Sequence, residues 1–534
     1  MKLATDIVKK ELAKYGKSTS IRGVPKCFTS SDRVLISLWI ISLTICTIVL
    51  IFLLSTSFEK YFSWPTMTQF GETIGEDLAF PDVTFCNIDV FADENAKKYS
   101  IEKYFEFVRS NKGQIKKLVN HKENSSIKVK RDVYEKFYSI PGYISNLPKH
   151  DGKGNKSCPE FIVSCSVFTL NWLSSDLDCA NNFLTIWEQN YYTCYTLRTS
   201  KLNKENNITI RGLSLVLNVG PPNFYQLPLR STIVGSQTRG VQVSVHSPGS
   251  SPDLKRGFSV APGTENVVTI VQTSRTRQNK PYNTLGCTSY KTVPLLPTEK
   301  YHRDLCIETC KQKLIEKNCG CLSHYLYIPS SFLDPVKICR NFSFDENNFS
   351  SKSSFNKSKM EDVIDSYLCS MKYVDTSTCD GDCLIRCEKT VYDTYIATSP
   401  WPQPALQLSI FGRYIFNCTR TDERVRQRYS KYLQLYYDFL SNSGQNFTEH
   451  SELKQIQESL LVVKLVMKDT FPLFLRDQPA ITWDAMFGII GGTLSLWLGI
   501  TVSTGVELIE LIYLIVKNYL TSKKEGVGQN DGKM

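Results

Sequence analysis

An uninterrupted apolar segment near the start of the chain is the feature that most constrains the fold. Residues 34–54 (VLISLWIISLTICTIVLIFLL) contain 21 residues and no charge, and about 20 apolar residues in a helix span a bilayer core. A signal peptide would be shorter and would be followed by small residues at a cleavage site, whereas Phe58-Glu59-Lys60-Tyr61 follows here. The sequence therefore predicts a retained transmembrane helix at 34–54.

A second apolar segment, residues 485–516, has a different character. Its first 22 residues are uncharged, then Glu507 and Glu510 interrupt it, and it contains five glycines. Two interpretations stay open: a tilted anchor whose acids reach the headgroups, or a helix that packs closely against others and faces water on one side. We expect the second, because a lipid-facing anchor needs neither the glycines nor the acids.

Charge and sugar-acceptor motifs predict the topology. Residues 1–33 hold eight Lys or Arg against three acids, and residues 517–534 hold four against two. The positive-inside rule places both tails in the cytosol, so residues 55–484 form an extracellular domain of a multi-pass plasma-membrane protein. All eight N-x-S/T glycosylation sequons lie in that domain, at Asn124, Asn155, Asn207, Asn341, Asn348, Asn356, Asn417 and Asn446.

The net charge of +11 does not indicate a nucleic-acid partner. Part of the excess lies in the two tails, where it is explained by topology, and no block of basic residues dominates the rest. Motifs of common enzymes (G-x-S-x-G, H-E-x-x-H, a P-loop, a full G-x-G-x-x-G) are absent from the sequence. We therefore expect neither an enzyme nor a cofactor.

Sixteen of the eighteen cysteines fall within residues 55–484. An even number of cysteines in an oxidising compartment suits eight disulfides. Zinc is the alternative, because Cys379-x3-Cys383 and Cys319-Gly320-Cys321 resemble ligand pairs and His302 and His324 lie nearby. We expect no metal, since extracellular thiols oxidise and no complete zinc-finger spacing is present.

Local patterns predict a mixed α+β extracellular domain. Residues 298–318 read as a helix that carries Cys306 and Cys310 on one face, and the four-residue spacing of Cys379, Cys383 and Cys387 suggests a second helix. Two helices joined by disulfides would form a stiff column. A further helix is expected at 421–440, an exposed glycosylated loop at 341–358, and strands at 213–219, 241–245, 266–272 and 460–467.

Several motifs together resemble the degenerin/epithelial sodium channel family, over about Thr19 to Val516. They are Phe80-Pro81-Asp82-Val83-Thr84-Phe85-Cys86-Asn87 after the first span, Cys194-Tyr195-Thr196, and Tyr301 before Cys306, Cys310, Cys319 and Cys321. Ser399-x-Trp401-Pro402 follows the cysteine cluster. Ile490-Gly491-Gly492, Leu496-Trp497-Leu498-Gly499 and Glu507-Leu508 resemble the family's pore helix.

The resemblance implies a trimeric, sodium-selective channel that amiloride blocks. It implies two transmembrane helices flanking a large disulfide-rich domain with finger, thumb, palm and knuckle-like parts, and a homotrimer is our first expectation. By order of occurrence it pairs Cys86–Cys194, Cys287–Cys387, Cys306–Cys383, Cys310–Cys379, Cys319–Cys369 and Cys321–Cys339. The partners of Cys158, Cys165, Cys179 and Cys418 stay open.

Pore and gate positions also follow from the resemblance. Glu507 and Glu510, three residues apart on a helix, would form acidic rings that attract Na⁺, and the narrow stretch would be Gly499-Ile500-Thr501. Gly488 matches the position where bulky side chains hold the family's gate open, with close helix packing as the alternative. Gating coupling would involve Tyr61 with Tyr282, and Arg22-Gly23, which stands where the family has His-Gly. An acid common in proton-gated members is Ile489 here.

The gating stimulus has several alternatives. Acidic and aromatic residues in the expected finger suit a short cationic, aromatic peptide of the Phe-Met-Arg-Phe-amide type: Asp89, Phe91, Tyr104, Phe105, Trp187, Tyr191 and Tyr192. The alternative for these residues is an amphipathic helix that packs its aromatics inward. For the whole protein, proton-gated or constitutively open sodium channels are alternatives, as is a glycosylated receptor or adhesion subunit with no pore of its own.

Overall fold

The computed structural model describes most of the chain. The described residues are 2–73, 78–93, 96, 100–120, 133–148, 157–169, 174–176, 182–206, 209–223, 238–328, 337–342, 357–441, 453–469 and 471–528. They form two compact units. The first combines residues 1–69, 280–284 and 477–534, and the second combines 70–279 and 285–476.

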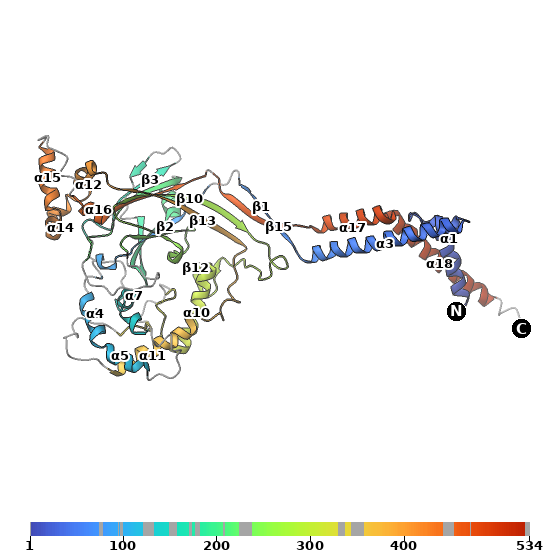
Figure 1. Cartoon of the computed structure of the whole chain (residues 1–534), viewed down its shortest axis with the longest axis horizontal. Helices are drawn as coiled ribbons and strands as arrows, with labels where there is room; N and C mark the ends of the chain where they lie inside the picture. Colours follow the sequence, from blue (N-terminus) through green and yellow to red (C-terminus); the bar gives the residue numbers. More distant parts are fainter. Residues whose placement is uncertain are drawn as a thin grey trace. The chain divides into compact units, whose positions relative to one another are not determined.

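The first unit is helical and contains both apolar segments. Helix α3 (Arg33–Phe62) is long and apolar enough to cross a membrane, and Asp32 caps its first turn. Helices α17 (Trp483–Leu498) and α18 (Val502–Gly528) meet the same criterion together as a pair bent by 75°. Helix α17 runs alongside α3, and the N-terminal helices α1 (Lys2–Ser18) and α2 (Val24–Thr29) accompany α18 and α3 (Figure 1).

The core of the second unit is a mixed eight-stranded sheet. Its path is β1-β15-β10-β14-β7-β3-β4, and β13 pairs with β10 antiparallel over its whole length. Strands β10 and β14 are parallel neighbours, and their alternating side chains bury Val268, Ile270 and Leu465. The strands are β1 (Thr66–Glu72), β3 (Ile162–Thr169), β4 (Ser174–Asp176), β7 (Ile210–Asn218), β10 (Thr264–Thr276), β13 (Glu388–Pro400), β14 (Leu460–Met467) and β15 (Leu473–Pro479).

A five-stranded sheet carries the motif that follows the first span. Its order is β5-β6-β2-β8-β9, with bounds Phe183–Glu188, Tyr192–Leu197, Asp82–Asn87, Val241–His246 and Phe258–Val260. Asp82 is fully buried at the start of β2. Its carboxylate accepts bonds from Arg198 Nη1 at 2.9 Å, from the Thr199 amide at 2.9 Å and from the Gly249 amide at 2.7 Å. A buried charge requires this degree of pairing.

Short elements and helices complete the second unit. The finger-like part contains η1 (Val90–Ala92), α4 (Ile101–Ser110), α5 (Lys112–Asn120) and α7 (Ile140–Ile144). Other helices are α9 (Thr199–Asn206), η3 (Leu254–Arg256), α10 (Arg303–Cys319), α11 (Lys357–Val374), η5 (Pro404–Leu406), α12 (Gln407–Tyr414), α13 (Cys418–Thr421), α14 (Glu423–Arg428), α15 (Ser430–Leu440) and α16 (Gln455–Ser459). The hairpin of β11 (Thr292–Val293) and β12 (Leu296–Lys300) precedes α10.

The structure forms all six disulfides that the resemblance implied and adds Cys158–Cys418. The expected eighth bond is not found among the described residues: Cys165 is buried on β3 with a free thiol, and Cys179 lies outside them. The four strands predicted from sequence are confirmed as parts of β7, β8, β10 and β14. The helix predicted at 421–440 is present in two pieces, α14 and α15.

Two predictions about the cysteine-rich region were wrong. The helix that carries Cys306 and Cys310 begins at Arg303 and not at 298, because Leu296–Lys300 pairs as β12. Residues 379–387 form turns and loop and not a second helix, and their Asp380-Gly381-Asp382 stretch has turn-forming composition. The disulfides at Cys379 and Cys383 therefore join one helix to a loop, while Cys369 of α11 ties two helices together.

Candidate functional site

The second apolar segment breaks at the stretch predicted to be the narrow part of the pore. Gly499 ends α17 with φ of 70°, a left-handed conformation that glycine adopts without cost. A Cβ there would also lie 2.7 Å from Cγ of Arg22. The Ile500 amide donates to the Leu494 carbonyl at 3.2 Å, and the Thr501 amide donates to Thr504 Oγ1 at 3.2 Å. Residues 499–501 thus form an ordered break and not a frayed helix.

The N-terminal segment lies directly at this break. The Arg22 amide donates to the Leu498 carbonyl at 2.9 Å, so it satisfies one of the acceptors that a helix end leaves unpaired. Gly23 has φ of 89°, and a Cβ there would lie 3.0 Å from the ring of Trp39 on α3. The structure therefore brings together Arg22, Gly23 and Gly499, which sequence reasoning assigned separately to coupling and to the pore.

The two acids of α18 have different surroundings. The Glu507 carboxylate accepts a bond from Thr19 Oγ1 at 3.1 Å and one from the Ser20 amide at 3.0 Å, while Ser20 Oγ lies 2.7 Å from Thr504 Oγ1. Glu510 is exposed. The contacts from Thr19 and Ser20 were missed from sequence, and no local pattern signals a contact across 488 positions.

Gly488 lies on an open face of α17. A Cβ added there would meet no described atom within 4 Å. Close packing within this chain therefore does not explain this glycine.

An aromatic cluster follows α3 and includes both tyrosines predicted to couple gating. Trp64 is the central ring: its centroid lies 5.2 Å from Tyr282 and 5.4 Å from Tyr61. Trp64 has φ of 51°, which is unusual for a bulky residue. Tyr282 therefore contacts the ring of Trp64, and Tyr61 packs against the same Trp64 ring.

Most residues predicted to bind a peptide are buried. Tyr104 is 0 % exposed and donates to the Phe137 carbonyl at 2.8 Å. Tyr192, Phe105 and Asp89 are also buried, and Asp89 pairs with Arg239 Nε at 3.4 Å. Because these four side chains pack in the interior, the inward-packing alternative describes them better than ligand contact. Phe91, Trp187 and Tyr191 remain half-buried.

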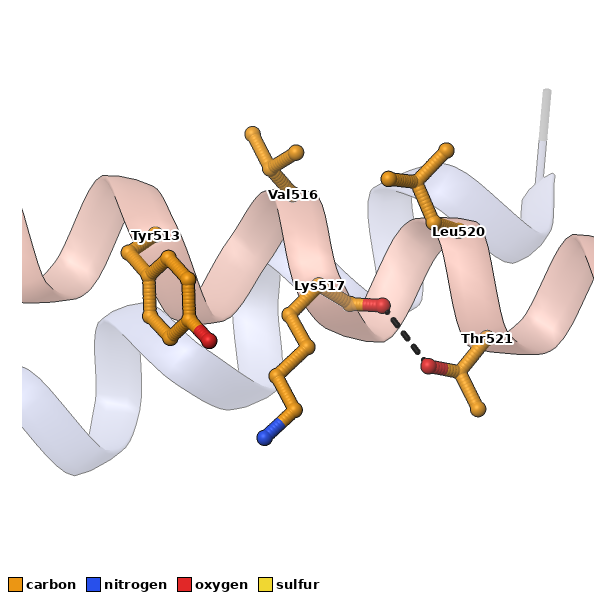
Figure 2. A pocket seen from close by; sticks show the side chains of 5 residues that line it. All are labelled: Tyr513, Val516, Lys517, Leu520 and Thr521. Carbon is orange, nitrogen blue, oxygen red and sulfur yellow. Dashed lines mark hydrogen bonds between the residues drawn. The ribbon is translucent and has the colours of Figure 1, made fainter.

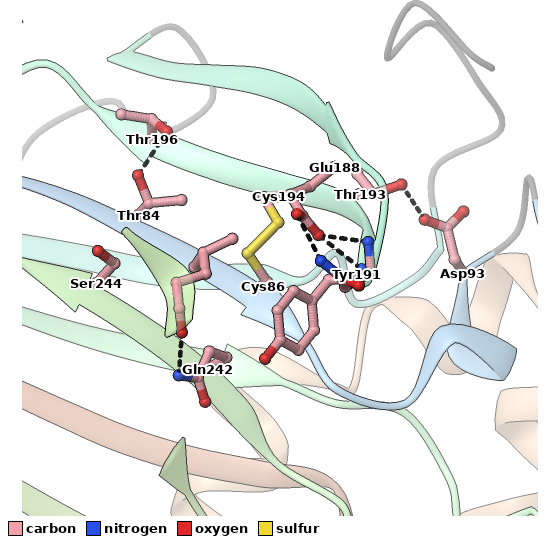
Figure 3. The surroundings of a disulfide bond; sticks show 12 residues. Thr84, Cys86, Asp93, Glu188, Tyr191, Thr193, Cys194, Thr196, Gln242 and Ser244 are labelled. Atoms are coloured by element: carbon pink, nitrogen blue, oxygen red, sulfur yellow. Dashed lines mark hydrogen bonds between the residues drawn. A yellow bond between two sulfur atoms is a disulfide. The ribbon is translucent and has the colours of Figure 1, made fainter. Parts of the chain in front are cut away.

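The tip of the β5–β6 hairpin is held by the carboxylate of Glu188, which is a half-buried residue. Glu188 accepts bonds from the Asn190 amide at 2.6 Å and from the Tyr191 amide at 2.9 Å, close to the Cys86–Cys194 disulfide (Figure 3). Burial raises the pKa of Glu188, and burial together with this carboxylate raises the pKa of Tyr191 to about 12. The hairpin tip is therefore fixed in place, and Tyr191 stays neutral at physiological pH.

A shallow pocket lies on α18 and is lined by Tyr513, Val516, Lys517, Leu520 and Thr521 (Figure 2). All five side chains come from one helix, and Thr521 Oγ1 donates to the Lys517 carbonyl at 2.8 Å. The lining contains no carboxylate. It therefore lacks the acidic group that a cationic peptide would need.

One group of side chains has metal-ligand geometry. Ligand atoms of Asp253, His302 and Asp304 lie within 4.8 Å of one another. Arg256 pairs with both aspartates, and burial together with the charge of Lys389 lowers the pKa of His302. The Arg256 guanidinium therefore occupies a position beside both carboxylates and offsets part of their charge.

Of the eight sequons, Asn341 and Asn417 belong to the described residues and the other six asparagines lie outside them.

Comparison with known proteins agrees with these features. Residues 15–511 match the model of the amiloride-sensitive sodium channel family. The chain is 24 % identical to the FMRFamide-activated amiloride-sensitive sodium channel of Cornu aspersum, over 96 % of this chain and 84 % of that protein. It is 23 % identical to the bile acid-sensitive ion channel of Rattus norvegicus, over 93 % and 86 %, and 20 % identical to acid-sensing ion channel 4-B of Danio rerio, over 95 % and 76 %. Members of this family are plasma-membrane ion channels and not enzymes. The chain belongs to the amiloride-sensitive sodium channel family, the degenerin/epithelial sodium channel family whose motifs it carries.

Proposed function

We propose that the chain is the pore-forming subunit of a trimeric, sodium-selective channel that an extracellular peptide opens and amiloride blocks. The observation that carries the pore assignment is the break at Gly499, which α18 follows with Glu507 and Glu510. Helix α3 and the α17–α18 pair would be the two spans, with both tails cytosolic and residues 55–484 extracellular. A receptor or adhesion subunit has no need of a broken acidic span.

Conduction would depend on charge and on backbone oxygens at the break. Carboxylates are costly in lipid and stable beside water, so three copies of Glu510, with Glu507, would line the cytosolic side of the pore and concentrate Na⁺. Carbonyls of residues 499–501 and the Thr501 hydroxyl would replace water around the ion. Thr19 and Ser20 would hold the Glu507 carboxylate in position, and the bond from the Ser20 backbone amide does not depend on the Thr19 hydroxyl.

Opening would reach the spans through the aromatic cluster. Tyr282 lies in the connection between β10 and β11, shortly before the disulfide-bonded Cys287, and it contacts Trp64 at the end of α3. A ligand that moves this connection would thereby move α3. The Arg22–Leu498 bond would transmit that motion to the break.

Peptide gating is the proposed stimulus, supported by the similarity to the FMRFamide-activated channel. The half-buried Phe91, Trp187 and Tyr191 remain as proposed contacts. Proton gating is the second candidate, and the acids Glu188 and Asp89, whose pKa values are raised by desolvation, are the observation in its favour.

Whole-cell recording separates these proposals. Cells expressing the chain alone are exposed to pH steps and then to an amidated Phe-Met-Arg-Phe peptide, with surface protein verified by biotinylation. A peptide-evoked current that amiloride blocks is expected. Current evoked by acid alone would favour proton gating over peptide gating. Constant current without any stimulus would favour a constitutively open pore.

A further inference from the structure

The sequon Asn417-Cys418-Thr419 overlaps a disulfide. Its middle residue, Cys418, is bonded to Cys158, which lies 260 positions earlier in the chain. The Asn417 side chain is exposed, whereas Cys418 and Thr419 are each 5 % exposed. One sequon residue therefore faces solvent while the other two are enclosed by the fold.

In the folded protein the sequon cannot be a substrate for the glycosyl transferase. The enzyme must reach the hydroxyl of the third residue together with the asparagine amide, and Thr419 Oγ1 instead donates to the Phe416 carbonyl at 2.7 Å. The backbone is also engaged, because residues 418–421 form α13 and the Asp422 amide donates to the Cys418 carbonyl at 2.9 Å. Modification would require unwinding this turn and exposing buried side chains.

We propose that Asn417 accepts an N-linked glycan only until the Cys158–Cys418 disulfide closes, so that the rate of closure limits glycan occupancy at this sequon. In glycosylation, the Asn417 amide nitrogen bonds to the anomeric carbon of a lipid diphosphate-linked oligosaccharide, loses a proton and releases the lipid diphosphate. In closure, the two thiols lose two protons and two electrons to the disulfide of a thiol oxidoreductase, which becomes a dithiol.

The order of events decides which product forms. Cys158 is synthesised long before Cys418, so its thiol is available as soon as Cys418 enters the lumen. A glycan added first is compatible with later closure, because the Asn417 side chain faces solvent while Cys418 turns inward. If the disulfide closes first, Thr419 becomes buried and Asn417 can no longer be glycosylated. Mature chains therefore comprise a glycosylated and an unglycosylated population with the same disulfide.

The test measures glycan occupancy at Asn417 in pulse-labelled full-length chains. Newly made chains give a signal whether or not a variant later folds. Glycopeptide mass spectrometry should find partial occupancy in the wild type and a rise toward completeness in Cys158→Ser. Cys418→Ser keeps an Asn-Ser-Thr sequon without the bond and should rise equally. Brief reduction during synthesis should raise occupancy in the wild type.

Two controls make the test specific. Cys287→Ser removes a different disulfide of the same domain, Cys287–Cys387, and should leave Asn417 unchanged. The sequon at Asn446 contains no cysteine and should not respond to any variant. Complete or zero occupancy at Asn417 in the wild type, or no change in Cys158→Ser, would overturn the inference. The inference rests on the proposed extracellular placement of residues 55–484, whose failure would show separately as the absence of glycan at all eight sequons.

Discussion

Replacing Trp64 is expected to weaken coupling between the extracellular domain and the spans. Its ring meets Tyr282 edge-on, with centroids 5.2 Å apart and an interplanar angle of 82°. Such pairs contribute about 0.5–1.5 kcal/mol beyond buried area. If the contact exists in only one gating state, Trp64→Ala changes the open-to-closed ratio by roughly two- to ten-fold, because about 1.4 kcal/mol is a factor of ten.

The assay is the concentration–response curve of the peptide-evoked current, with current normalised to surface protein. Trp64→Phe retains an aromatic ring and should lie close to the wild type. Trp64→Gly removes the ring but accommodates the φ of 51°, so it separates loss of the ring from relief of the backbone. A double-mutant cycle with Tyr282→Ala isolates the contact itself. Additive effects of the two alanine substitutions would refute the proposed route.

Three further predictions address the pore, the gate and pH. Glu507→Gln should reduce the preference for Na⁺ over K⁺ several-fold, whereas Thr19→Ala, which removes a bond and keeps the charge, should leave the reversal potential unchanged; equal shifts would contradict the charge-based mechanism. Gly488→Val should produce current without ligand, because a Cβ at this position meets no described atom within 4 Å and the valine would act against another subunit of the proposed trimer; a silent variant at normal surface level would argue against the gate. Burial lowers the pKa of His246 to about 4. Between about pH 6.5 and pH 4 the unfolded state therefore binds more protons than the folded state. The free energy of unfolding falls by about 1.4 kcal/mol for each unit by which the pH is lowered within that range. Thermal unfolding of the purified protein at pH 7.5 and pH 5 should show this loss in the wild type and a smaller one in His246→Gln, and identical losses would assign the effect to other groups.

Features that depend on local pattern were predictable from sequence. The uncharged run at 34–54 lies within α3, a helix that is long and apolar enough to cross a membrane. β-branched or apolar runs predicted strands β7, β8, β10 and β14. The family resemblance implied six disulfides that the structure forms.

Features that depend on distant contacts were not predictable. The amphipathic pattern of α4 was compatible with ligand contact or with packing, and only burial of Tyr104 and Phe105 against other finger elements decides between them. The spacing of Cys379, Cys383 and Cys387 imitates a helix, but Gly381 and two aspartates favour a turn. The resemblance implied a narrow stretch that begins at Gly499, whereas the 75° bend and the docking of Arg22 arise from tertiary structure.

The most direct test of the central claim is the reversal potential of the amiloride-blocked current in cells expressing this chain. The current is evoked by the amidated peptide in the wild type, and Gly488→Val provides a second route to an open pore. Replacing external Na⁺ by K⁺ should shift the reversal potential to more negative values, and Glu507→Gln should diminish that shift. An unchanged reversal potential, or no amiloride-blocked current from either protein when both are verified at the surface, would contradict a sodium-selective pore formed by this chain.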